Sequence, residues 1–311
     1  MSQKKWDTII IGGGPAGLAA GIYAARARLH TLLIEKLGQG GQILLTNWIE
    51  NYPGFPEGVS GFHLAELFSQ QSTNFGLEIL NGEVDTITEK EGDKEIRIQN
   101  QNFLTKTVIV ASGASPLRLG VDGEEEMIGK GVSFCATCDG PFYKDKVVAV
   151  VGGGDSAVEE AIFLTKFAKK VYIIHRRDEL RATKILQERA LNNTGIEMLW
   201  DSVVEKIEGD KQGVKRIHLK NVKSEKLSGL DSDGIFIYIG IKPNVDFLPR
   251  ELRKDSRDFL ITDENMETSI PGIFAAGDVR SKLLRQVVTA VGDGATAAFA
   301  AELYIHKYYQ S

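Results

Sequence analysis

Cysteine is the scarcest residue in this 311-residue sequence, which holds only Cys135 and Cys138. Disulfide-stapled secreted folds need more cysteines at scattered spacings, so that class of protein is excluded. A structural zinc site needs four ligands, and no second pair of cysteines or histidines lies near this one in the sequence. A lone Cys-x-x-Cys in an otherwise cysteine-free chain is typical of a redox pair, with an inert pair of thiols as the alternative.

Long apolar runs and an excess of positive charge are also lacking. No apolar run approaches the ~20 residues of a membrane helix. The N-terminal apolar residues lead directly into Gly12, which predicts a first strand rather than a signal peptide. Acidic residues outnumber basic ones by 42 to 37. We therefore expect a cytoplasmic protein that binds neither nucleic acid nor a membrane.

Glycine, by contrast, is abundant, with 33 residues in a chain long enough for about two domains of ~100–200 residues. The first glycines lie in an ordered pattern. Residues 8–11 predict a buried strand, 12–17 a glycine turn, 18–28 a helix and 31–34 a second strand. Strand, turn, helix and strand in this order indicate a βαβ unit.

The same pattern recurs in the middle of the chain. Residues 147–151 predict a strand, 152–157 a glycine turn, 158–168 a helix and 171–174 a return strand. The interval between the two patterns is too long for a solenoid repeat. The sequence therefore predicts two separate dinucleotide-binding units.

Each glycine turn has the residues that phosphate binding requires. The first glycine permits a tight turn, the second lets a pyrophosphate approach the backbone, and a third small residue lets helix and strand pack closely. The phosphates then lie at the helix N-terminus. The residues in these positions are Gly12, Gly14 and Gly17 in the first unit, and Gly152, Gly154 and Ala157 in the second. The alternative is a pair of glycine-rich turns without a ligand.

The end of the second strand distinguishes the two nucleotides. Glu35 ends that strand in the first unit, and a carboxylate there can accept a hydrogen bond from a free ribose hydroxyl, as in FAD or NAD. The equivalent place in the second unit holds His175, Arg176 and Arg177, with Arg181 a turn later. Guanidinium groups pair with a 2′-phosphate, so the first unit suits FAD and the second NADPH. The alternative for the arginines is an ordinary solvated charge run.

The cysteine pair precedes the second glycine turn and is followed by Asp139. Thiol–disulfide exchange needs a thiolate and a proton donor, and a neighbouring carboxyl group can serve as acid or base. The alternative for Asp139 is a helix N-cap. NADPH, FAD and a dithiol would form a series of two-electron carriers. Since the chain has no further cysteine, the final acceptor must reach Cys135 and Cys138 directly.

The remaining segments complete the expected domain organisation. We predict a strand at 107–110, a hairpin within 203–219, strands at 234–239 and 272–275, and a helix over about 284–309. Pro116 and Pro243 flank the middle unit. The expected fold is α/β, with two Rossmann-like, doubly wound, three-layer domains: 1–115 and 244–311 bind FAD, and the inserted domain 116–243 binds NADPH and carries the cysteine pair.

These motifs together resemble the bacterial-type, low-molecular-weight thioredoxin reductases. The residues that carry the resemblance span 12 to 294 and include Cys-Ala-Thr-Cys-Asp-Gly at 135–140, His-Arg-Arg-x-x-x-Arg at 175–181, Gly40-Gly41-Gln42, Asn51-Tyr52-Pro53-Gly54, Ala276-Gly277-Asp278 and Arg285-Gln286-Val287. The resemblance implies a homodimeric flavoprotein that uses NADPH to reduce thioredoxin. It also implies that Cys138 faces the flavin, Cys135 attacks the protein substrate and Asp139 handles protons.

The motifs and the resemblance, which implies Glu35, Gln42, Asn51, Asp278 and Gln286 as FAD contacts, together give the expected cofactor contacts. For FAD they are Gly12, Gly14, Pro15, Ala16, Gly17, Glu35, Gly41, Gln42, Asn51, Ala111, Gly113, Gly277, Asp278, Arg285, Gln286 and Val287. For NADPH they are Gly152, Gly154, Asp155, Ser156, Ala157, His175, Arg176, Arg177 and Arg181. No metal site is expected. One segment departs from the family pattern: Ile-Leu-Leu-Thr-Asn-Trp at 43–48 is bulkier than the threonine-rich run expected there.

Three other functions remain compatible with parts of this pattern. A ferredoxin–NADP reductase of the same fold would lack the dithiol. A FAD-dependent dithiol oxidase would not need Arg176, Arg177 and Arg181. A non-catalytic flavin redox sensor would control a partner through its disulfide, and an assay of NADPH oxidation with and without thioredoxin separates it from an enzyme.

Overall fold

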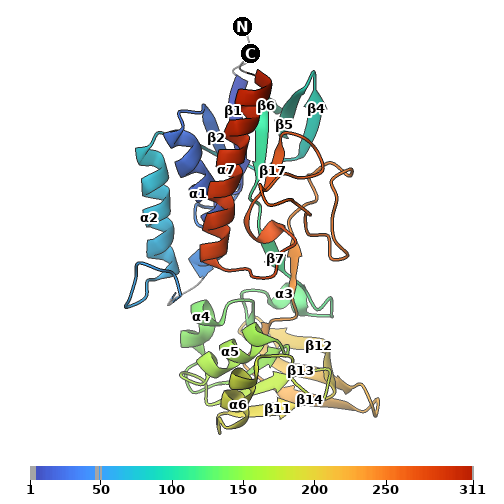
Figure 1. The fold of residues 1–311 in the computed structure, drawn as a ribbon. Helices are drawn as coiled ribbons and strands as arrows, with labels where there is room; N and C mark the ends of the chain where they lie inside the picture. Colours follow the sequence, from blue (N-terminus) through green and yellow to red (C-terminus); the bar gives the residue numbers. More distant parts are fainter. Residues whose placement is uncertain (1–4, 46–48, 50, 310–311) are drawn as a thin grey trace. The chain divides into compact units, whose positions relative to one another are not determined.

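A computed structural model describes residues 5–45, 49 and 51–309 of the chain, apart from the side chains of Leu45, Thr137 and Cys138. The chain divides into two compact units (Figure 1). Unit 1 lies within 1–115 and 242–311, and unit 2 comprises 116–241. The boundary after residue 241 falls two residues before the one expected from the sequence.

Unit 1 is built on a mixed sheet with the strand order β3-β2-β1-β6-β5-β4, and β17 also pairs with β6. Strands β3, β2, β1, β6 and β17 are parallel, whereas β4 and β5 form an antiparallel extension. The central strand carries Ile9, Ile10 and Ile11, all buried, because parallel strands are covered on both faces. The strands are β1 (Lys5–Ile11), β2 (Thr31–Glu35), β3 (Glu78–Asn81), β4 (Thr86–Lys90), β5 (Asp93–Ile98), β6 (Gln101–Val110) and β17 (Ile273–Ala275).

Two helices with small residues pack closely beside this sheet. Helix α7 lies along α1 (Figure 1), and a side chain at Gly294 would place its Cβ 2.0 Å from the carbonyl oxygen of Ala16. Glycine at this position therefore permits the close approach that holds the first glycine turn against the C-terminal helix. The helical segments of unit 1 are α1 (Pro15–Arg26), η1 (Gly41–Leu45), α2 (Gly61–Asn74), η3 (Gly277–Val279) and α7 (Val287–Tyr309).

Unit 2 contains a five-stranded parallel sheet and a three-stranded antiparallel one. The parallel sheet has the order β11-β10-β9-β15-β8, and the antiparallel sheet has the order β12-β13-β14. The strands are β8 (Val132–Ser133), β9 (Val147–Val151), β10 (Lys170–Ile174), β11 (Ile196–Leu199), β12 (Ser202–Asp210), β13 (Gly213–Asn221), β14 (Leu227–Asp231) and β15 (Gly234–Ile237). The helical segments are α3 (Glu124–Met127), α4 (Ala136–Asp139), η2 (Gly140–Tyr143), α5 (Asp155–Leu164) and α6 (Lys184–Leu191).

The two connections between the units run side by side. Strands β7 (Ala114–Pro116) and β16 (Ile241–Pro243) pair with each other. Within unit 1 the amide of Asn244 donates to the carbonyl of Gly113 at 3.1 Å, and within unit 2 the amide of Leu117 donates to the carbonyl of Gly240 at 2.9 Å. Unit 2 is thus inserted into unit 1 through two adjacent strands.

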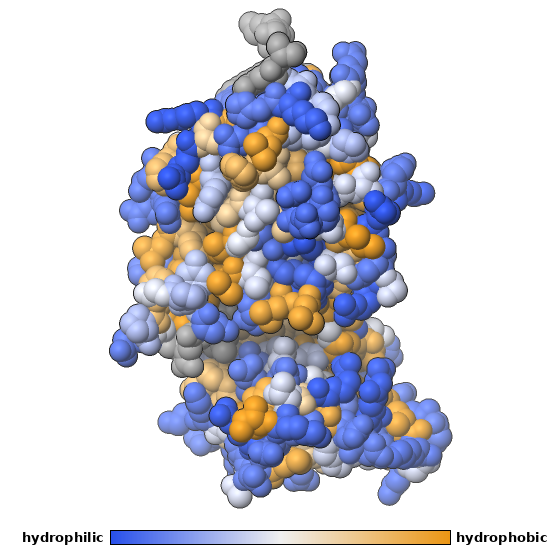
Figure 2. Space-filling view, in the orientation of Figure 1, coloured by the Kyte–Doolittle hydropathy of each residue, from blue (hydrophilic) through white to orange (hydrophobic). Residues whose placement is uncertain are grey.

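Both predicted βαβ units are present, and the inserted α/β architecture is confirmed. The helices begin earlier than predicted, α1 at Pro15 and α5 at Asp155, because the first turn of each contains small or polar residues outside the apolar pattern. Helix α7 begins later, at Val287. On the face shown in Figure 2, apolar residues form small groups among hydrophilic ones. No helix in the described part of the chain has the length and apolarity to cross a membrane.

Candidate functional site

The first glycine loop exposes the N-terminus of α1. Gly12 has φ +108°, and a Cβ there would lie 2.3 Å from the carbonyl oxygen of Ala111. A Cβ on Gly17 would lie 1.8 Å from the carbonyl oxygen of Gly12, whereas Gly14 has open space around it. Gly14 is the N-cap of α1 and makes no side-chain capping bond. The loop is therefore closed toward the protein and open where a phosphate group would approach the helix N-terminus.

Glu35 organises the loop from the end of β2. Its Oε2 accepts a hydrogen bond from the amide of Gly13 at 2.6 Å, and its Oε1 accepts from the amides of Leu37 and Gly38 at 2.8 and 3.3 Å. Carboxylate oxygens have additional lone pairs. Glu35 can therefore hold this backbone and still accept a hydrogen bond from a ribose hydroxyl.

Segments far apart in the sequence contribute the other predicted FAD contacts of unit 1. The side-chain amide of Asn51 donates to Oε1 of Gln286 at 3.0 Å, which joins residues 235 positions apart. The Gln42 amide donates to the carbonyl of Ala114 at 3.3 Å. Gly113, at φ +67°, has open space around it. Thr46, Asn47 and Trp48, the end of the bulky segment, lie outside the described residues.

Asp278 provides the best test of whether this region fits a hydroxyl-rich ligand. Its Oδ1 is buried and has no hydrogen-bond partner among the described residues. Burial raises the pKa of Asp278, while the positive charges of Lys282 and Arg285 oppose that rise. Buried polar atoms in proteins almost always have a partner. The orphaned carboxylate oxygen therefore fits the polyol chain of FAD.

Arg285 is held by unit 1 itself. Its guanidinium donates to the carbonyls of Asp278, Lys282 and Arg280, and it lies 3.9 Å above the ring of Phe259. The structure thus shows Arg285 fixing the segment before α7.

The second glycine loop repeats this construction in unit 2. Gly152 has φ +148°, and a Cβ there would lie 2.4 Å from the carbonyl oxygen of Tyr238. Gly154 has open space around it and is the uncapped N-cap of α5. Ala157 is fully buried. A side-chain oxygen of Asp155 accepts from the amide of Thr183 at 2.6 Å, which anchors the following loop.

The arginine segment is fastened to that loop by its backbone. The amides of Arg181 and Ala182 donate to the carbonyl of Gly153 at 2.6 and 3.0 Å. Arg176, Arg177 and Arg181 are exposed. The arginine segment is therefore anchored by its backbone to an open glycine loop, which suits recognition of a 2′-phosphate.

His175 differs from its arginine neighbours because it is buried. A Cβ on Gly153 would lie 2.3 Å from the His175 ring, so the imidazole packs directly against the loop. Burial lowers the pKa of His175, and the nearby arginines lower it further. Its Nε2 has no hydrogen-bond partner among the described residues.

Cys135 and Asp139 lie in a short turn, residues 133–139, which we term the redox turn. Cys135 is disulfide-bonded. The Ser133 hydroxyl accepts from the Cys135 amide at 3.1 Å and donates to the Cys135 carbonyl at 3.3 Å. The amide of Ala136 donates to the hydroxyl of Tyr238 at 2.7 Å. The side chain of Cys138 is outside those described.

Asp139 ends α4 and precedes η2, and its side chain makes no capping hydrogen bond to η2. Asp139 thus occupies the N-cap position of η2, as the alternative predicts, but without a side-chain capping hydrogen bond. Ser133 and Tyr238 were missed by the sequence argument. Ser133 could have been noticed two residues before Cys135, but no local pattern links Ala136 to Tyr238, which follows 102 residues later.

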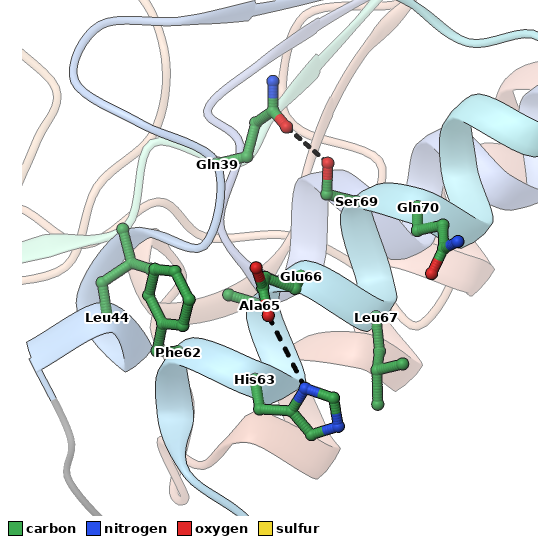
Figure 3. A pocket seen from close by; sticks show the side chains of 9 residues that line it. All are labelled: Gln39, Leu44, Phe62, His63, Ala65, Glu66, Leu67, Ser69 and Gln70. Atoms are coloured by element: carbon green, nitrogen blue, oxygen red, sulfur yellow. Dashed lines mark hydrogen bonds and ion pairs between the residues drawn. The ribbon is translucent and has the colours of Figure 1, made fainter.

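A surface pocket lies elsewhere in unit 1, beside α2 (Figure 3). It has a volume of about 460 Å³ and contains none of the predicted cofactor contacts. Its polar groups partner each other: Ser69 donates to Gln39, and Glu66 lies 3.6 Å from His63.

No group of three potential metal ligands gathers within the described residues.

Comparison with known proteins places this geometry in context. Residues 6–294 match the family described as pyridine nucleotide-disulphide oxidoreductase. The thioredoxin reductase of Treponema pallidum is 45% identical over 97% of this chain and 98% of its own. The Lactococcus lactis thioredoxin reductase structure is 44% identical, covers 97% of this chain and 99% of its own, and has a TM-score of 0.90. The corresponding values for the T. acidophilum thioredoxin reductase are 33%, 98%, 99% and 0.86.

Proposed function

The chain belongs to the pyridine nucleotide-disulphide oxidoreductase family, and we propose that it is an NADPH-dependent thioredoxin-disulfide reductase with FAD as its cofactor. The observation that carries this function is the presence, in unit 2, of both the redox turn and an open glycine loop that accepts a hydrogen bond from the backbone of Arg181, in a segment with three exposed arginines. The reaction converts NADPH, a proton and oxidised thioredoxin into NADP⁺ and dithiol thioredoxin. FAD, when bound, supplies two-electron transfer between the nicotinamide and the redox pair.

Unit 1 supplies the FAD site in this proposal, which corresponds to the domains 1–115 and 244–311. The glycine loop receives the pyrophosphate at the N-terminus of α1, Glu35 receives the ribose, and Asp278 receives the polyol chain. The full proposed set is Gly12, Gly14, Pro15, Ala16, Gly17, Glu35, Gly41, Gln42, Asn51, Ala111, Gly113, Gly277, Asp278, Arg285, Gln286 and Val287.

Unit 2 supplies the NADPH site, within the domain 116–243. Gly152, Gly154 and Ala157 form the pyrophosphate loop, with Asp155 and Ser156 opening α5. Arg176, Arg177 and Arg181 pair with the 2′-phosphate, and the buried His175 positions the loop. Forked guanidinium contacts of this kind favour NADPH over NADH because NADH has no 2′-phosphate.

The redox turn transfers the electrons to thioredoxin by two thiol–disulfide exchanges. The Cys135 thiolate attacks one sulfur of the thioredoxin disulfide and releases the other sulfur as a thiolate, forming a mixed disulfide. The Cys138 thiolate then attacks the Cys135 sulfur, which restores the internal disulfide and releases the second thioredoxin sulfur. Asp139 exchanges protons with these sulfurs.

We also propose a homodimer located in the cytoplasm, with no nucleic-acid or membrane partner. The family resemblance supports the dimer. The acidic balance of the chain and its two cysteines support the location and the absence of these partners. Sedimentation of the holoenzyme tests the dimer directly.

The decisive experiment is the oxidation of NADPH by the purified protein with and without oxidised thioredoxin. Thioredoxin-dependent NADPH consumption with one dithiol formed per NADPH is expected. Cys135→Ser should abolish this consumption while NADPH still bleaches the flavin, because the thiols act after the nicotinamide. Oxygen consumption driven by a small dithiol without NADPH would instead support the dithiol oxidase, and no consumption of NADPH would support the sensor.

A further inference from the structure

Tyr238 joins the two functional segments of unit 2. Its amide donates to the carbonyl of Val151 at 2.8 Å, directly before the second glycine loop. Its own carbonyl oxygen lies 2.4 Å from the position that a Cβ on Gly152 would take. Its hydroxyl accepts from the amide of Ala136, the residue that follows Cys135. One residue therefore contacts both the nucleotide loop and the redox turn.

The contact to Ala136 is made in a buried environment. Ala136 is fully buried in the same apolar cluster as Val148, Val150 and Ala157, and Tyr238 packs against that cluster. Burial raises the pKa of Tyr238, and the negative charges of Glu160 and Asp139 raise it further, so the phenol stays neutral. The neutral hydroxyl accepts from the Ala136 amide in a partly buried place, and loss of the hydroxyl would remove this partner of the amide.

We propose that Tyr238 is a positioning residue of the redox turn: its hydroxyl fixes the backbone beside Cys135 and so favours re-formation of the internal disulfide. This inference rests on the proposed assignment of Cys135 and Cys138 as the redox pair.

The stability of the disulfide depends on the effective concentration of one thiol at the other. When the disulfide is reduced, the S–S bond breaks, two electrons and two protons are taken up, and the turn gains freedom. A tether on Ala136 limits that freedom, because Ser133 already holds the amide and carbonyl of Cys135 on one side and Tyr238 holds the next amide on the other. Removing the Tyr238 hydroxyl lets the dithiol state relax further, so the disulfide should become easier to reduce.

The test uses Tyr238→Phe in the FAD-loaded enzyme, with Tyr172→Phe as the matched control. Tyr172 lies on β10, whereas Tyr238 directly follows β15, and these two strands are not neighbours in the parallel sheet. Each protein is equilibrated against dithiothreitol buffers of graded oxidised-to-reduced ratio, and free thiols are alkylated and counted by intact mass. The count is unambiguous because the chain has two cysteines.

We expect Tyr238→Phe to shift the redox equilibrium three- to tenfold toward the dithiol, and tenfold corresponds to about 30 mV for a two-electron couple. The kcat for thioredoxin reduction should fall at least threefold, with the KM for NADPH within twofold of wild type. Tyr172→Phe should change neither quantity. An equilibrium for Tyr238→Phe within twofold of wild type, or an equal shift in Tyr172→Phe, would overturn the proposal.

A second variant removes the same hydrogen bond from the donor side. Ala136→Pro deletes the amide hydrogen at the first residue of α4, where the fixed φ of proline suits a helix start and the ring carbon on the nitrogen displaces the Tyr238 hydroxyl. The double variant Ala136→Pro/Tyr238→Phe should shift the equilibrium no further than the larger single change, and fully additive shifts contradict a shared bond. The titration needs no thioredoxin. An absence of thioredoxin turnover in the wild type therefore contradicts the proposed function without affecting this result.

Discussion

Glu160, on α5, has a half-buried side chain with an unusual titration. Its Oε2 has no hydrogen-bond partner among the described residues. Burial, together with the charge of Glu159, raises its pKa from 4.5 to about 7. The folded protein thus prefers the protonated form. The stabilising effect of that preference is complete below pH 4.5 and is lost as the pH rises through 7.

We predict that Glu160→Gln stabilises the protein at alkaline pH and much less at acid pH. An amide cannot ionise, so the variant avoids the cost of a buried negative charge. Between pH 5 and pH 8 the difference in unfolding free energy between variant and wild type should grow by roughly 2–3 kcal/mol, measured by urea denaturation. Glu188→Gln, at an exposed position on α6 of the same unit, is the control. A pH-independent difference for Glu160→Gln would contradict the raised pKa.

The three exposed arginines carry a second prediction at this scale. Replacing Arg176, Arg177 and Arg181 by glutamine should weaken NADPH and largely spare NADH. If the charge-assisted contacts together contribute about 3 kcal/mol, the ratio of kcat/KM for NADPH to that for NADH falls at least a hundredfold. Arg189→Gln, on exposed α6 of the same unit, should leave this ratio unchanged. An equal loss with both nucleotides would place the 2′-phosphate site elsewhere.

At the scale of elements, the second glycine loop contains one glycine that packing requires, Gly152, and another that leaves space for a ligand, Gly154. Gly152→Ala forces a Cβ to within 2.4 Å of the Tyr238 carbonyl oxygen at φ +148°, whereas Gly154→Ala meets nothing within 4 Å. We predict that Gly152→Ala lowers the melting temperature of unit 2 by several degrees. Gly154→Ala should melt like the wild type but raise the KM for NADPH, because its methyl group enters the space left for the pyrophosphate. Equal melting temperatures for the two variants would refute this division.

The elements that the sequence predicted best are those whose signal is local. A buried apolar strand followed by three glycines and a helix is recognisable over about 25 residues, and both such units were predicted. The starts of α1 and α5 were missed by three residues because Pro15, Asp155 and Ser156 lie outside the apolar pattern. Contacts across long separations, such as Ala136 with Tyr238 or Asn51 with Gln286, leave no pattern in one sequence. They depend on the three-dimensional path of the chain.

At the scale of the whole molecule, we predict that unit 2 rotates relative to unit 1 during turnover. The nicotinamide site and the redox pair are both assigned to unit 2, and both need the one flavin held by unit 1. A disulfide packed against that flavin would also be hidden from a protein substrate. Short connections at Pro116 and Pro243 can act as a pair of hinges.

The prediction is tested by a short covalent cross-link between the units, installed in the oxidised enzyme. The fully cross-linked protein should retain FAD and lose thioredoxin reduction, and cleavage of the cross-link should restore it. Normal turnover by protein shown to be fully cross-linked would contradict the rotation. A cross-linker confined to unit 1 serves as the control.

The paired connections also bear on how such a chain could arise and be altered. The backbones of Gly113 and Asn244 are hydrogen-bonded to each other within unit 1, and those of Leu117 and Gly240 within unit 2. The two ends of the interruption in unit 1 therefore lie next to each other, and so do the two ends of unit 2. Unit 2 is therefore a separable insertion in unit 1. Its removal would leave a gap in the host that a turn of a few residues can span, and its own two ends are close enough for a circular permutation. Gene fusion at this junction could therefore replace unit 2, the proposed NADPH-binding domain, without interrupting the sheet or the hydrophobic core of unit 1.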